Sequence, residues 1–158
     1  MEQKEINRII DQVNRFYDGP CWPGTTLHDI LDDVDAGMAN AVMPFTLQTI
    51  HRIVLHVLAT EKVVISRLDG ADHVLSESED WPSYEETLRM NWDETRAKVK
   101  QSMQSLLDRI NRLQDEQLDA PILKGFSSIY VTLHGHLQHT YYHYGQVMLL
   151  KKILQSRN

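Results

Sequence analysis

The sequence predicts an all-α fold, a four-helix bundle that forms a single domain over residues 1–158. Apolar residues recur every three to four positions along most of the chain, and almost no segment alternates with the period of two that marks a strand. Capping residues and glycines bound the periodic segments, and the connections between them have the lengths found in bundles. A chain of 158 residues with 42% hydrophobic content can bury one core and is too short for two.

The first predicted helix carries isoleucines, a valine and a phenylalanine at three- and four-residue steps over residues 6–16. Asp18-Gly19-Pro20 ends this helix, and the turn-rich connection over residues 18–24 contains Trp22, which we expect to anchor it. Thr25 or Thr26 then caps a short extra helix.

The second long helix is predicted over residues 49–68, and Gly70 ends it. A polar loop over residues 69–81 follows, which is either a mobile lid or a surface crossover. The sequence Ser83-Tyr-Glu-Glu86 is a capping box, and it predicts a third long helix that continues to about residue 113.

The last helix is predicted over residues 129–154, with Ser127 or Ser128 as its cap, and it carries the motif His139-Thr-Tyr-Tyr-His143. Two imidazoles four residues apart project from one face of a helix, which is the spacing at which one helix supplies two metal ligands. The same face is apolar at both ends and polar in the middle, which indicates either a buried hydrogen-bond network or a site. Its members are Ile129, Thr132, His136, His139, His143, Gln146, Leu150 and Ile153.

Charge and cysteine content exclude several classes of protein. The formal net charge is -6, with 16 basic and 22 acidic residues, which argues against binding to nucleic acid or to an anionic membrane surface. The single cysteine, Cys21, excludes an intramolecular disulfide framework and favours a reducing compartment. The N-terminus has no apolar signal core, and no run approaches the ~20 apolar residues of a membrane span. We therefore expect a soluble cytoplasmic protein.

A third histidine turns the pair into a candidate metal site. His56 lies on a partly apolar face of the second long helix, so it can point inward towards His139 and His143. Three protein ligands with one open position are the catalytic pattern of zinc, and imidazole also suits nickel, iron and copper. Helix spacing alone leaves open that these are ordinary buried or surface histidines.

The chain also resembles a known family. The residues that carry the resemblance are Asp18-Gly19 with Trp22, the segment TIHRIVLHVLATE over residues 49–61, and the segment LHGHLQHTYYHYGQVMLLK over residues 133–151. These look like the DinB-like superfamily, which includes proteins described as metal-dependent hydrolases and bacterial thiol transferases. The resemblance implies an up-down-down-up bundle with a divalent metal held by His56, His139 and His143.

The resemblance implies a metal-dependent enzyme in which the ion activates water or a thiol, so that the protein is a hydrolase or a thiol transferase acting on a small molecule such as a thiol. Zinc or nickel is the expected ion, with iron as a further candidate. The alternative is a non-enzymatic metal-binding or stress-response module. A polar residue placed as a general base beside the open metal position would favour the enzyme, and an apolar seal would favour the module. The sequence assigns no catalytic residue.

Other residues near the motif have open roles. His136 is a hydrogen-bond partner of a ligand, an alternative ligand or a core residue, with the first and last favoured. His134 points to the opposite side of the helix, and we expect it to make a structural hydrogen bond. Gln146 either orients a ligand or substrate or simply packs. The remaining histidines have no partner that spacing can assign, and we expect them on the surface or in loops: His28, His51 and His73.

The last helix is apolar on a second face as well, which bears Leu137, Tyr141, Tyr144 and Met148. A helix that is hydrophobic on two sides is buried on two sides. Either the other helices cover both faces or a second subunit covers one, and we favour a homodimer.

Overall fold

The computed structural model describes residues 4–46 and 48–156, and within these ranges the chain forms helices and no strand. Only two isolated β-bridges occur in the described residues. The long helices are α1 (Lys4–Tyr17), α4 (Ile50–Leu68), α7 (Trp92–Ile110) and α8 (Ile129–Gln155). The short elements are α2 (Leu27–Asp32), α3 (Ala36–Ala39), α5 (Glu77–Asp80), α6 (Tyr84–Leu88) and the 3-10 helix η1 (Asp115–Gln117). The predicted all-α fold and the short extra helix after the first are therefore confirmed.

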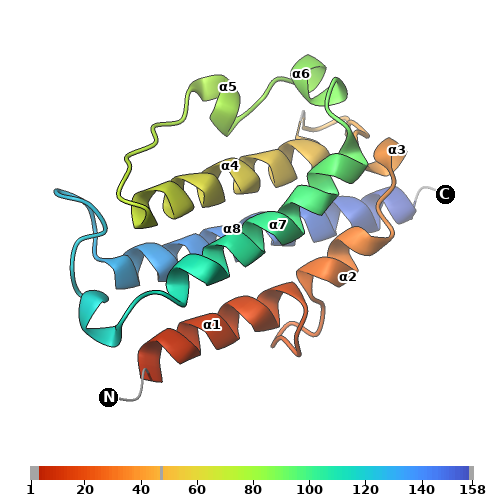
Figure 1. Cartoon of the computed structure of the whole chain (residues 1–158). Coiled ribbons are helices and arrows are strands. Elements are labelled where there is room, and N and C mark those ends of the chain that lie inside the picture. Colours follow the sequence, from red (N-terminus) through yellow and green to blue (C-terminus); the bar gives the residue numbers. More distant parts are fainter. Residues whose placement is uncertain (1–3, 47, 157–158) are drawn as a thin grey trace.

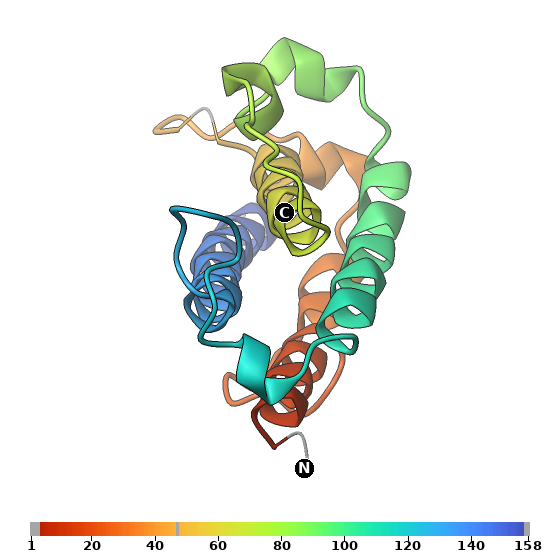
Figure 2. The same cartoon turned by 60° about the vertical axis from the view of Figure 1, so that its left-hand side comes forward.

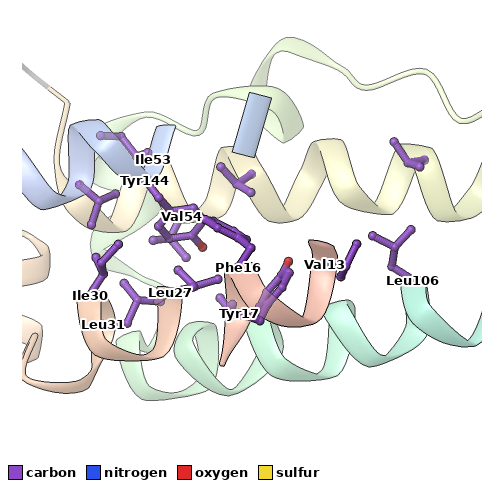
Figure 3. Close-up of a cluster of buried hydrophobic side chains, with 14 of the residues drawn as sticks. Val13, Phe16, Tyr17, Leu27, Ile30, Leu31, Ile53, Val54, Leu106 and Tyr144 are labelled. Carbon is purple, nitrogen blue, oxygen red and sulfur yellow. The ribbon is translucent and has the colours of Figure 1, made fainter. Parts of the chain in front are cut away.

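The four long helices surround one apolar core. Helix α4 packs against both α7 and α8, and α1 packs against the same two helices from the other side (Figures 1 and 2). Side chains from α1, α2, α4, α7 and α8 meet between them, among them Phe16, Val54 and Tyr144 (Figure 3). The chain is thus a helical bundle, and α4 and α8 are direct neighbours within it.

The caps predicted from the sequence form most of the helix boundaries. The side chains of Thr26, Thr49 and Ser128 each accept a hydrogen bond from a backbone N–H in the first turn of the helix that follows. After α4 the chain turns at Gly70, whose φ of 86° is a backbone conformation that glycine adopts without strain. The boundaries of α4 and α8 therefore follow from local chemistry.

The third long helix is shorter than predicted. Ser83 and Glu86 do form the expected capping box, but it opens only the short helix α6. Asn91 starts a new helix, because its side chain accepts a hydrogen bond from the backbone N–H of Glu94 and competes with continuation of α6. The prediction of one helix over residues 83–113 was therefore wrong, and α7 begins at Trp92.

Two further expectations about packing are corrected or refined. Trp22 was expected to anchor its turn, but its side chain is fully exposed. The second apolar face of α8 packs against the chain's own core: Tyr144 is buried, and the ring of Tyr141 lies 4.2 Å from that of Phe16 on α1.

No helix in the described part of the chain is long and apolar enough to cross a membrane.

Candidate metal centre

Three histidines from α4 and α8 come together inside the bundle. His56 of α4 faces His139 and His143 of α8, and each residue offers a ring nitrogen within 4.8 Å of those of the others. The Nε2 atoms of His56 and His139 are 3.0 Å apart. His139 and His143 lie one helical turn apart with ring centroids 4.4 Å from each other, as their spacing predicted.

This donor set fits a divalent metal ion. A tetrahedral ion with metal–nitrogen bonds of about 2.0–2.1 Å holds its ligand nitrogens roughly 3.3 Å apart, which is close to the separation of the two Nε2 atoms. His56 and His143 are buried and His139 is half-buried. Three imidazoles that leave a fourth position for another ligand match the pattern of catalytic zinc sites, although nitrogen donors also suit nickel and iron.

Hydrogen bonds to the outer ring nitrogens orient two of the three histidines. The Nδ1–H of His56 lies 2.8 Å from Oδ1 of Asp80 and 3.0 Å from the backbone carbonyl oxygen of the same residue. The Nδ1–H of His143 donates to Oε1 of Gln146 over 3.0 Å. Because these oxygens only accept, the proton stays on Nδ1 in both rings and Nε2 keeps the lone pair that a metal needs.

The segment between α4 and α6 covers the cluster. Trp81 stacks on the ring of His56 with centroids 3.9 Å apart and planes inclined by 11°. Its indole also meets His143 edge to face, at 5.7 Å. The capping box of α5, formed by Ser76 and Glu79, holds the turn that presents Asp80 and Trp81. The polar loop of the sequence is thus part of the site.

Burial keeps His139 and His143 uncharged near neutral pH. Loss of water lowers the pKa of His139 to about 4, and the neighbouring imidazoles of His143, His56 and His136 act in the same direction. Burial also lowers the pKa of His143, against the hydrogen bond to Gln146, which raises it. Both rings are therefore in the neutral form that binds a metal.

A cavity of about 390 Å³ borders the cluster between α4, α8 and the covering loop. His139, His136 and Asp80 line its inner end, whereas Arg67 and His73 line it further along α4. The walls between them are largely aliphatic, with Val63, Val64, Val74 and Leu75. This volume is within the range of small-molecule sites, and residues of the polar loop over residues 69–81 line it. The turn around Trp22 does not contribute to its lining.

Comparison with known proteins agrees with this geometry. A family model described as the DinB superfamily matches residues 24–147. The chain belongs to the DinB superfamily. The matched range includes all three clustered histidines and begins after α1. No curated protein and no solved structure matches the chain.

In this DinB protein His136 belongs to a second buried network next to the cluster. Its Nε2–H donates to Oε2 of Glu61 over 3.0 Å, and the hydroxyl of Tyr17 donates to the same oxygen over 2.8 Å. Glu61 is only 1% exposed, and its other oxygen has no hydrogen-bond partner among the described residues. Burial and the neighbouring Glu61 raise the pKa of Tyr17. His136 is therefore tied to Glu61, and the same residue lines the cavity.

Three functional partners were missed in the sequence. Glu61 had a signal, since it is an acidic residue on the buried face of α4, between Val57 and Val64. Asp80 and Trp81 had none, because no helix period indicates where a loop side chain points. Gln146 was proposed as an orienting residue or a packing residue, and its hydrogen bond to His143 favours the first.

The other histidines separate into distinct environments. His51 was expected on the surface, and this was wrong: it is fully buried, with its ring nitrogens 3.0 Å from Oδ1 of Asn40 and from Oγ1 of Thr95. His134 lacks its expected hydrogen bond, because within the described residues its buried Nε2 has no hydrogen-bond partner. His28 is exposed and His73 lies in the loop, as expected.

Proposed function

We propose that this protein is a metal-dependent enzyme whose ligands are His56, His139 and His143, with zinc or nickel as the ion and iron as a further candidate. The observation that supports it is the convergence of three ring nitrogens from α4 and α8 beside a cavity large enough for a small molecule. A divalent ion bound there lowers the pKa of a bound water to about 7, or deprotonates a coordinating thiol. The proposed reaction is accordingly hydrolysis or thiol transfer.

The side chains around the cavity favour an enzyme over a metal-binding module. A module would be sealed by apolar residues, whereas here Asp80 and His136 line the cavity together with His139. Because Nε2 of His136 donates to Glu61, its Nδ1 is the nitrogen that can take a proton from a substrate in the cavity. Trp81 and the aliphatic walls keep water from the buried side of the cluster.

The test combines metal analysis with two substrate panels, one of small thiols with electrophilic acceptors and one of amides and esters. We expect metal-dependent turnover in one panel, loss of it with a chelator, and recovery when metal is added back. His139→Ala should abolish turnover, whereas the matched variant His134→Ala should keep it. Absence of turnover in both panels, in protein shown to hold its ion, would favour the binding module.

We also propose the up-down-down-up order of the long helices. In support, contacts join the starts of α4 and α7 (His51 to Thr95) and their ends (Asp69 to Arg109), as in parallel neighbours. Helices α4 and α8 are antiparallel neighbours by the same reasoning. Glu61 follows His56 on α4, but its partner His136 precedes His139, the partner of His56, on α8. In Figure 1 the sequence colours show α4 and α7 running in one direction and α1 and α8 running in the opposite direction.

We further infer that the protein is a cytoplasmic homodimer. Exposed apolar side chains recur along one face of α8, at Val131, Tyr142 and Leu149, and this face is free for a second copy. The face bearing Leu137 and Tyr141 is instead used within the chain. A reducing location agrees with the free thiol of Cys21.

A further inference from the structure

The cavity beside the histidines is elongated along α4 and has two chemically different ends. His56 and Arg67 are eleven residues apart on α4, about three helical turns; Arg67 lines the cavity, whereas His56 lies next to it through its contact with His139. Their Cα atoms are separated by roughly 16 Å of helix rise. Since side chains lean towards the helix N-terminus, the guanidinium reaches back towards the cluster. A ligand that touched both ends would therefore be on the order of 10 Å long.

The end remote from the histidines carries the cationic side chain of Arg67. The guanidinium of Arg67 stacks over the ring of Phe126 at 4.4 Å and is held at 3.3 Å from Oδ1 of Asp72. His73 lines the same part of the cavity, and its buried Nε2 has no hydrogen-bond partner among the described residues. Oε1 of Glu79 lies 3.6 Å from this nitrogen. Arg67 is thus the positive charge at this end of the cavity, positioned by Phe126 and Asp72, whereas the buried Nε2 of His73 faces Glu79.

The middle of the cavity is aliphatic. Val63 and Val64 of α4 form one wall, and Val74 and Leu75 of the covering loop form another. These side chains offer no hydrogen bonds, so a polar or charged group placed there would lose its hydration without compensation. The cavity therefore selects against ligands that are polar along their whole length.

We propose that the cavity binds a small molecule with a carboxylate at one end, held by Arg67, and an apolar body whose other end reaches the histidine cluster. Arg67 can hold a carboxylate through two parallel N–H donors, which a neutral group cannot match. This inference rests on the proposed function, because it needs the open position at His56, His139 and His143. It adds the substrate class: carboxylate-bearing compounds with an apolar spacer.

The test uses cobalt-loaded protein and pairs of linear thiols of equal length, one ending in a carboxylate and the other in an alcohol. Cobalt reports thiolate binding through an absorption band, so the readout does not depend on turnover. We expect the acid to bind about tenfold tighter than the alcohol at spacer lengths near 10 Å, and about equally at the shortest lengths. Arg67→Gln should remove this preference and leave alcohol binding unchanged. Arg67→Lys should restore part of it.

Controls separate the possible failures. Arg8→Gln removes an exposed arginine of α1 that pairs with Glu5, and this variant should behave as the wild type. Equal affinity of acid and alcohol at every length in the wild type would overturn the carboxylate inference while the histidine site stands. Failure to take up cobalt would overturn the proposed function together with the inference that rests on it. Cobalt uptake without a thiolate band for any thiol would overturn the inference and the thiol-transfer reaction, and hydrolysis would remain as the proposed reaction.

Discussion

The contact between Asp80 and His56 gives a quantitative prediction for metal affinity. Asp80→Asn removes the negative charge 2.8 Å from the Nδ1–H of His56 and leaves the shape of the side chain almost unchanged. Loss of such an outer partner typically weakens metal binding by 10- to 100-fold, or about 1.4 to 2.8 kcal/mol. The Asp80 side chain is 39% exposed and its backbone carbonyl still accepts from Nδ1, so we expect the lower figure, about tenfold.

The assay is competition for zinc against a chromophoric chelator, at fixed pH and ionic strength. Fluorescence offers a second readout, because Trp81 stacks on His56 and should respond when the ring binds metal. Glu77→Gln is the matched control, since it removes one exposed acidic charge from the same short helix. If Asp80→Asn and Glu77→Gln changed zinc affinity equally, the proposed orienting role of the carboxylate would be refuted.

Three other predictions concern the site, the core and assembly. His139→Ala should remove most metal affinity and His134→Ala should preserve it in the same competition assay; equal losses would reject the assigned ligands. Because burial lowers the pKa of His51 to about 4 from 6.5, the unfolded chain binds more protons between these values, so stability should fall as pH drops from 6.5 to 4. Between pH 6.5 and pH 4, the free energy of unfolding measured with urea should fall by about 2 kcal/mol less in His51→Gln than in the wild type. An equal fall in the two proteins would contradict this account. Sedimentation should show a dimer that Tyr142→Glu weakens, and a wild-type monomer at high concentration would exclude it.

Most helix boundaries could be predicted because they depend on neighbours in the sequence. Thr49 and Ser128 cap α4 and α8 through hydrogen bonds that span three residues, and Gly70 follows α4 for a conformational reason that is equally local. The wrong prediction of one continuous helix across residues 89–91 also concerns residues that are close in the sequence. Ser83 and Asn91 can both act as N-caps, and both do so, for α6 and α7. Which of them begins the long helix depends on packing, which hydrophobic periodicity does not describe.

The histidine pair on α8 was determined by the sequence, since a separation of four residues places His139 and His143 on one face in any straight helix. Only the tertiary structure decided that His56, 83 residues before His139, lies opposite them, because this depends on α4 and α8 packing as neighbours. It also decided the roles of Asp80, Trp81 and Glu61. The partner of a loop side chain or of a buried carboxylate lies on a segment distant in the sequence. Helical periodicity shows which face of a helix a residue occupies, but it does not show which distant segment packs against that face.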